Sequence, residues 1–109
     1  MKFNFKYKGK NFNIDVEKCE NYFSRASGLM FRKKSKPLLF IFNGKTKQAI
    51  HSFFCVPFIA VWFDGEKIVD AKFVKPWRFS VKPKEKFDKL LEIPVNDENF
   101  NAIRLLIIK

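Results

Sequence analysis

The sequence is short of the residue types from which most catalytic and metal sites are built. It has one histidine, two cysteines and four glycines in 109 residues. Cys19 and Cys55 lie outside any C-x-x-C pattern, and together with His51 they match no zinc-binding spacing. The scattered glycines exclude a glycine-rich phosphate-binding loop. We therefore expect neither a metal nor a cofactor.

Long apolar runs are also lacking. The apolar segments LLFIF and FIAVWF have the length of strands, far below the ~20 residues that a membrane-spanning helix needs. No apolar run follows the opening Met-Lys, so we expect no signal peptide. Two thiols in a lysine-rich chain are typical of a reducing compartment. The expectation is a soluble, cytoplasmic protein with no membrane partner.

Acidic residues are scarce relative to basic ones. The chain has 22 Lys and Arg against 11 Asp and Glu, which gives a net charge of +11. Such a charge favours a polyanionic partner such as nucleic acid. Lysines outnumber arginines, however, and they are spread along the whole chain. The alternative interpretation is therefore that the many lysines reflect a bias in amino-acid composition and not a ligand.

Aromatic and aliphatic residues are abundant. The chain is 47% hydrophobic and has fifteen phenylalanines, enough for one core at this length. We expect a single domain over residues 1–109. One amphipathic helix is predicted near residues 18–27, ended by Gly28 in the left-handed conformation of a C-terminal cap. Its apolar face has the spacing i, i+3, i+4 and i+7, formed by Cys19, Tyr22, Phe23 and Ala26.

The rest of the sequence has the period-two pattern of strands. Apolar and polar residues alternate in KFNFKYKGKNFNIDV, which predicts a hairpin. LLFIF is predicted as a buried strand that turns at Asn43-Gly44 onto KQAIHSFF, and FIAVWF turns at Asp64-Gly65 onto KIVDAKFV. KLLEIP is expected to be a strand, and RLLIIK a final buried strand after one possible helical turn in NDENFNAI. The fold class is mainly β (α+β), either an antiparallel barrel or a strongly curved sheet with one short helix.

Candidate catalytic residues are few. His51, with Ser52 or Cys55 as a nucleophile, is the basis for a hydrolase or transferase hypothesis, but no G-x-S-x-G motif accompanies it. Acid–base chemistry would need carboxylates, and three of the four candidates lie in or beside a turn, where solvated charge is the default. The four carboxylates are Asp64, Glu66, Asp70 and Glu92. Nothing in the sequence assembles a catalytic set, so we do not predict an enzyme.

The segment KPWRFSVKPK combines aromatic and basic residues. Trp77, Arg78 and Phe79 could stack a nucleobase and hold a phosphate. The alternative is a twisted edge in which Trp77 covers the core and solvated lysines surround it. The flanking basic residues are Lys75, Lys82 and Lys84.

Several segments together resemble a known family. SRASGLMFRK, LLFIFNG, IHSFFCVPFIAVWFDGEKIVDAKFVKPWR and KLLEIP resemble the prokaryotic family called domain of unknown function 192, in its archaeal branch. The resemblance runs from Ser24 to Pro94 and implies a compact β-rich domain for which no activity is established. The Asp that usually opens the family's central strand is absent here, where the chain reads Pro57-Phe58-Ile59-Ala60.

The best interpretation of the sequence is a small β-rich, non-enzymatic domain that binds a ligand or partner. The alternative is a nucleic-acid-binding module that uses the lysine-rich surface with Trp77 and Arg78. A hydrolase or transferase that uses His51 ranks third. The candidate binding residues are Arg25, Arg32, His51, Trp77 and Arg78.

Overall fold

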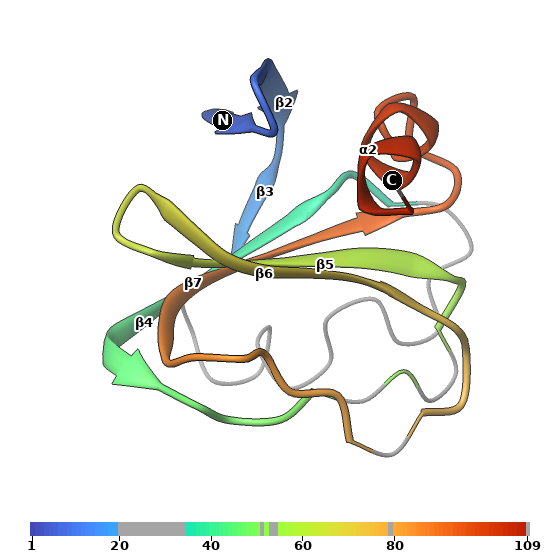
Figure 1. Ribbon diagram of the computed structural model, residues 1–109. Coiled ribbons are helices and arrows are strands. Elements are labelled where there is room, and N and C mark those ends of the chain that lie inside the picture. The colour runs from blue at the N-terminus through green and yellow to red at the C-terminus, as the bar shows by residue number, and fades with distance from the viewer. Residues whose placement is uncertain (20–34, 51, 53–54, 79, 109) are drawn as a thin grey trace.

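The computed structural model describes residues 1–19, 35–50, 52, 55–78 and 80–108. Within them the chain forms a two-stranded sheet, a five-stranded sheet and one helix (Figure 1). The two-stranded sheet pairs β1 (Lys2–Tyr7) with β2 (Lys10–Asp15). The five-stranded sheet has the order β3-β4-β7-β5-β6. Its strands are β3 (Glu17–Cys19), β4 (Leu38–Thr46), β5 (Phe58–Asp64), β6 (Lys67–Val74) and β7 (Phe87–Pro94), and the helix is α2 (Phe100–Ile107).

The predicted N-terminal hairpin is confirmed. Lys8 and Gly9 have φ angles of 49° and 81°, the left-handed conformation that a two-residue hairpin turn requires. In the register of the hairpin Phe5 lies opposite Phe12, so alternate apolar side chains gather on one face. The hairpin is thus a two-stranded ribbon with an apolar inner face and a polar outer face.

The predicted β5–β6 hairpin and the β7 strand are also confirmed. Asp64 pairs with Lys67 across the turn, where Gly65 has a φ of 62°. β7 lies between β4 and β5 and is antiparallel to both. The whole β5 segment is apolar because this central strand is covered on both faces, and its residues from Phe58 to Phe63 are buried.

The predicted hairpin at Asn43-Gly44 is wrong. β4 continues through this dipeptide, and its pairing with β7 shifts register between Ile41 and Thr46. Within the described residues β4 pairs with β3 in parallel and with β7, while Ile50 forms only an isolated bridge to Val81. A glycine at a φ of 90° suits a β-bulge as well as a turn, so the dipeptide alone does not decide between them.

The C-terminal segment is a helix, so the predicted final strand RLLIIK is wrong. α2 buries Phe100 and Ile103 and leaves Leu105 exposed, the period of an amphipathic helix. A short apolar run does not by itself distinguish a strand from a helix. The helix forms because it packs on the sheet through β5 and β6.

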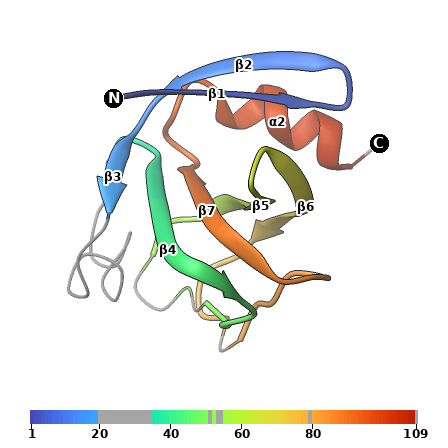
Figure 2. The same ribbon diagram turned by 90° about the vertical axis from the view of Figure 1, so that its left-hand side faces the viewer.

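The five-stranded sheet has a hydrophobic core on each face. The β1–β2 ribbon and α2 cover one face, which we call the near face (Figures 1 and 2). The opposite, far face carries Leu38, Phe40, Phe58, Trp62 and Phe87. The mainly β prediction is confirmed, and the described strands form an open arrangement rather than a closed barrel. The helix expected at 18–27 is wrong at its start, because Lys18 and Cys19 lie in strand β3 and pair with β4. The rest of that segment and Gly28 lie outside the described residues, and the single domain stays a prediction.

Candidate functional site

The segment that joins β6 to β7, residues 75–86, carries the KPWRFSVKPK side chains and runs along the far face (Figure 1). Its first turn is held by Ser52, which is fully buried. The Ser52 hydroxyl donates to the carbonyl oxygen of Lys75 over 2.6 Å and accepts from the backbone N–H of Arg78 over 2.7 Å. The Ser52 carbonyl oxygen also accepts from the Trp77 N–H over 3.0 Å, and the Ser52 N–H donates to the Arg78 oxygen over 3.1 Å. Four hydrogen bonds to one residue therefore fix this turn.

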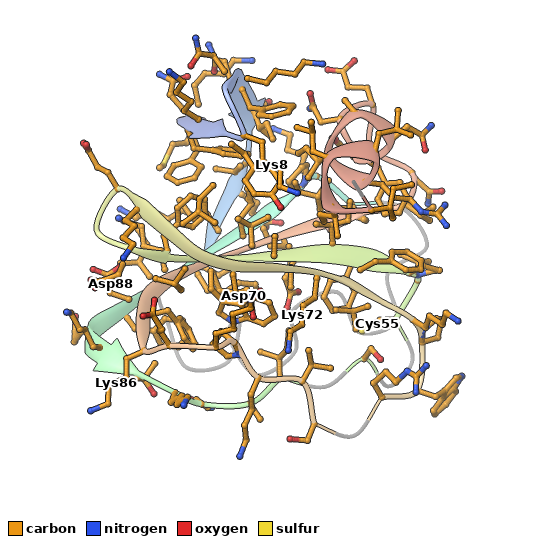
Figure 3. The ribbon with its side chains drawn as sticks, in the orientation of Figure 1. Lys8, Cys55, Asp70, Lys72, Lys86 and Asp88 are labelled. Carbon is orange, nitrogen blue, oxygen red and sulfur yellow. The ribbon has the colours of Figure 1, made fainter. Side chains whose placement is uncertain are left out.

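The second half of the segment is held by two side chains of β6. Asp70 accepts hydrogen bonds from the backbone N–H groups of Lys84, over 3.0 Å, and Ala71, over 2.9 Å. Lys72 donates from Nζ to the carbonyl oxygen of Lys82. Figure 3 shows Asp70 and Lys72 on the far face. The expectation of a solvated Asp70 is wrong, because this carboxylate is only 9% exposed and serves as an acceptor for the segment's backbone.

Trp77 is the most unusual residue of the segment. It has a φ of 64°, a left-handed conformation that is costly for a bulky residue, and its side chain is 57% exposed. The interpretation that Trp77 covers the core is therefore wrong. Arg78 is exposed beside it, and the flanking lysines are exposed as well. They are Lys75, Lys82 and Lys84. We call Trp77, Arg78 and these lysines the platform.

The structure describes only some of the other predicted site residues. Arg25, Arg32, His51 and Phe79 lie outside the described residues. Cys55 is half-buried at the far face (Figure 3). Its burial and the neighbouring Glu92 carboxylate raise the pKa of the Cys55 thiol to about 11. The thiol is therefore protonated at neutral pH, and a protonated thiol is a weak nucleophile.

Glu92 is a functional candidate whose burial was not predicted from the sequence. It lies on β7 directly opposite Leu38 of β4 and Ala60 of β5, on the far face. It is 6% exposed, and burial raises the pKa of its carboxyl to about 8. The signal was present in the sequence, because LLEIP places one acid inside an apolar strand. Ala60 is the position nearest to the Asp that the family resemblance leads one to expect.

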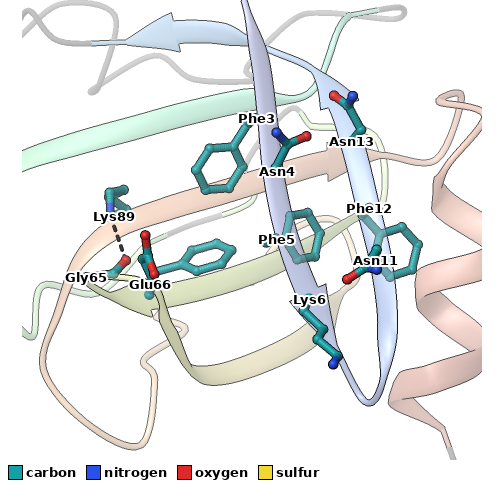
Figure 4. A pocket seen from close by; sticks show the side chains of 11 residues that line it. Phe3, Asn4, Phe5, Lys6, Asn11, Phe12, Asn13, Gly65, Glu66 and Lys89 are labelled. Carbon is teal, nitrogen blue, oxygen red and sulfur yellow. Dashed lines mark hydrogen bonds between the residues drawn. The ribbon is translucent and has the colours of Figure 1, made fainter.

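A cavity of about 660 Å³ lies between the β1–β2 ribbon and the β5–β6 turn (Figure 4). Its aromatic lining comes from Phe3, Phe5, Phe12 and Phe63, whose rings pack against one another. The polar lining residues are Asn4, Lys6, Asn11, Asn13, Glu66 and Lys89. Lys89 donates from Nζ to the Gly65 carbonyl oxygen over 2.6 Å. The cavity has room for a small ligand but contains neither a nucleophile nor a pair of carboxylates.

Two further properties concern the described residues only. No three histidine, cysteine, aspartate or glutamate side chains in that part of the chain are grouped so that they could hold a metal ion. In the same part, no helix has the length and apolar character that crossing a bilayer requires.

These features define a class: a small β-rich domain with a covered central strand and an exposed aromatic and basic segment. The chain belongs to the family of domain of unknown function 192 (DUF192), described as "Uncharacterized ACR", whose model matches residues 4–103. The predicted resemblance is confirmed. The chain is 36% identical to UPF0127 protein PF1050 of Pyrococcus furiosus over 91 residues, which cover 80% of this chain and 78% of the relative. It is 38% identical to UPF0127 protein PYRAB11210 of Pyrococcus abyssi over 94 residues, which cover 83% and 75%.

Two solved structures share the fold. A Novosphingobium aromaticivorans protein of unknown function has a TM-score of 0.78 and 16% identity, with 97% of this chain and 77% of that chain covered. A Sinorhizobium meliloti protein described as a "putative transcription regulator" has a TM-score of 0.76 and 16% identity, with 94% and 81% covered. At this identity the likeness concerns the fold alone.

Proposed function

We propose that this protein is a non-enzymatic binding domain whose contact surface is the platform around Trp77. The observation that carries the proposal is the conformation of Trp77, a large apolar side chain held outward at a φ of 64°. Left-handed conformations of bulky residues persist only where the surrounding structure imposes them, and they are concentrated at functional sites. Here Ser52 imposes the conformation through its hydrogen bonds to residues 75–78.

The partner that fits the platform best is single-stranded nucleic acid. An exposed indole offers a stacking surface for an unpaired base, and a base–aromatic stack contributes roughly 1–3 kcal/mol. Arg78 and the exposed lysines of the platform would contact phosphates, and the net charge of +11 would speed association. The words "transcription regulator" in the description of the Sinorhizobium meliloti neighbour agree with this proposal.

The state of the two candidate nucleophiles supports binding rather than catalysis. The Ser52 hydroxyl donates a hydrogen bond to the carbonyl oxygen of Lys75 and accepts one from the backbone N–H of Arg78, and the side chain is fully buried. The Cys55 thiol has a pKa of about 11 and stays protonated at neutral pH. A mechanism based on His51 would therefore lack an activated nucleophile at Ser52 or Cys55.

The test is a titration of a fluorescently labelled oligouridine of about 12 nucleotides at several potassium chloride concentrations. The logarithm of the affinity should fall linearly with the logarithm of the salt concentration. Trp77→Ala should weaken binding by about tenfold or more, since it removes a stack. Arg78→Ala should reduce the salt slope by about 0.7, the value for one phosphate contact on a single strand.

The matched control is Lys6→Ala. It removes the same unit of charge from an exposed position on the β1–β2 ribbon, which covers the near face. Lys6→Ala should leave the affinity within about twofold of the unmodified protein. Absence of binding at low salt would refute the proposal. Equal losses in Lys6→Ala and Arg78→Ala would also refute it, because the attraction would then come from net charge alone.

A further inference from the structure

Strand β1 has an edge whose backbone groups lack partners in the part of the chain that the structure describes, and we call it the open edge. The hairpin turn has two residues, so Tyr7 and every second residue before it form their backbone hydrogen bonds with β2. The bond from the Val16 N–H to the Met1 carbonyl oxygen, over 2.7 Å, follows the same alternation. The backbone N–H and C=O groups of Asn4 and Lys6 therefore point away from β2, where no described strand pairs with them.

The cavity between the β1–β2 ribbon and the β5–β6 turn lies along this open edge (Figure 4). Residues 3–6 of β1 and 11–13 of β2 line one side of the cavity, and Gly65, Glu66 and Lys89 line the other. β1 stands between β2 and the β5–β6 turn, so its open edge faces the turn. A further strand would lie about 4.8 Å from β1 and would enter this space.

An extended segment paired with β1 would direct its side chains alternately to the two faces of the ribbon. One set would enter the cavity, where the apolar lining consists of phenylalanine rings. These are Phe3, Phe5, Phe12 and Phe63. The other set would lie on the outer face, beside the exposed side chains of Asn4 and Lys6. The segment that fits the open edge therefore alternates apolar and polar residues, as β1 itself does.

The charge around the open edge favours acidic residues at the polar positions of that segment. Residues 1–16 contain four lysines and a single acid, Asp15, which pairs with the N-terminal amine over 3.2 Å. Among the charged residues that line the cavity, Lys6 and Lys89 are basic and Glu66 is acidic. Opposite charges on neighbouring strands stabilise a pair and like charges destabilise it. An acidic segment therefore complements this side of the molecule.

A second copy of this chain fits the open edge less well than an acidic segment does. Two β1 strands paired antiparallel about Asn4 would place Lys2 of one copy directly opposite Lys6 of the other. Like charges in that position are destabilising, and lysines on an edge strand are a common protection against pairing between copies. The charge pattern thus favours a different protein as the source of the segment.

We propose that the open edge of β1 binds an extended segment of an acidic partner protein. The backbone of the segment pairs with Asn4 and Lys6, its apolar residues enter the cavity, and its acidic residues lie beside the lysines of the ribbon. In such strand addition the main-chain hydrogen bonds give affinity and the pockets for alternate side chains give specificity. The site lies on the near face and the Trp77 platform belongs to the far face, so this proposal does not rest on the nucleic-acid proposal.

The test measures the exchange of backbone N–H protons with water by NMR on the isotope-labelled full chain. The probe is the peptide Glu-Ile-Glu-Ile-Glu, acetylated and amidated at its ends. In the free protein the N–H groups of Asn4 and Lys6 should exchange fast, and those of Phe3 and Phe5 slowly, because the latter bond to β2. Saturating peptide should slow the exchange at Asn4 and Lys6 by about tenfold or more. The indole resonance of Trp77 should not move.

Two N-methylated peptides separate backbone pairing from attraction by charge. In an antiparallel pair the residues opposite Asn4 and Lys6 direct their N–H groups toward β1 and their side chains to the outer face, so these residues are the glutamates. Methylation of the glutamate nitrogens should lower the affinity by about tenfold or more. Methylation of the isoleucine nitrogens, which point to solvent, should leave it within about twofold. The reverse order would support the same edge with a parallel strand.

A scrambled peptide, Glu-Glu-Glu-Ile-Ile, has the same charge and composition without the alternation, and it should bind about tenfold more weakly. Three results would overturn the proposal: unchanged exchange at Asn4 and Lys6, equal affinities of the two methylated peptides, or equal affinities of the alternating and scrambled peptides. Slow exchange at Asn4 and Lys6 in the peptide-free protein, increasing with protein concentration, would assign the edge to a second copy and would overturn it as well.

Discussion

Trp77 is held in a left-handed conformation by a residue from a distant part of the chain, since its backbone N–H donates to the carbonyl oxygen of Ser52 over 3.0 Å. The same serine accepts from the N–H of Arg78 and donates to the oxygen of Lys75 through its hydroxyl. The exposed side chain of Trp77 is thus presented by a buried polar contact rather than by a regular turn sequence. Ser52, a candidate nucleophile in the sequence, has a positioning role in the structure.

Replacing Ser52 should weaken the fold. Ser52→Ala removes the hydroxyl and leaves the Lys75 oxygen and the Arg78 N–H without their partner, which should lower the free energy of unfolding by about 1–3 kcal/mol. Urea denaturation measures the effect. Ser80→Ala, at an exposed position, is the control and should stay within about 0.5 kcal/mol of the unmodified protein. Equal stabilities of the two variants would show that the Ser52 hydroxyl does not hold the turn.

The left-handed conformation of Trp77 leads to a separate prediction about the effect of a glycine at this position. Trp77→Gly and Trp77→Ala remove the same exposed indole, but only glycine adopts a φ of 64° without strain. Trp77→Gly should therefore be more stable than Trp77→Ala by about 1 kcal/mol in urea denaturation. Arg78, whose φ is not positive, should show the opposite order, with Arg78→Gly less stable than Arg78→Ala. The same order at both positions would contradict the strain argument.

Glu92 should make the stability of the protein depend on pH. Its carboxyl has a pKa of about 8 when folded, against an ordinary value of 4.5. Between these values the folded protein binds the proton and the unfolded chain does not, so stability falls as pH rises. The slope should approach about 1.4 kcal/mol per pH unit and flatten above about pH 8. Glu92→Leu should lack this slope in urea denaturations from about pH 5 to about pH 9.

We expect the packing of Phe100 against the sheet to contribute most of the free energy that holds helix α2 in place. This side chain is 2% exposed and packs against Phe73 of β6 with ring centres 5.9 Å apart. Phe100→Ala should cost about 3–5 kcal/mol of unfolding free energy. Leu105→Ala, on the exposed side of the same helix, should cost about 0.5 kcal/mol or less, and thermal or urea denaturation of both variants checks this. Similar losses would mean that α2 packs through a different face.

Much of the local structure followed from the sequence because it depends on neighbouring residues. Period-two alternation and a positive-φ turn were enough to predict the β1–β2 hairpin, and Asp64-Gly65 was enough for β5–β6. Asn43-Gly44 led to a wrong prediction because, among the described residues, β4 pairs with β3 and with β7, and β7 lies far away in the sequence. The C-terminal helix was not predicted because its apolar residues fit either a strand or a helix. Packing against β5 and β6, which the sequence does not show, favours the helix.

The candidate site was predicted only in part. Composition and spacing pointed to Trp77 and Arg78, but their exposure depends on the bonds that Ser52 makes across the fold. The burial of Asp70 could not be inferred, since burial of a carboxyl depends on what covers it, whereas the apolar neighbours of Glu92 in LLEIP were a signal that the sequence did contain. The sequence by itself determined the β1–β2 and β5–β6 hairpins with their tight turns, the β7 strand and the family, because these depend on local pattern. Only the tertiary structure decided which polar groups are buried and which aromatic ring is exposed, because desolvation is set by contacts between distant segments.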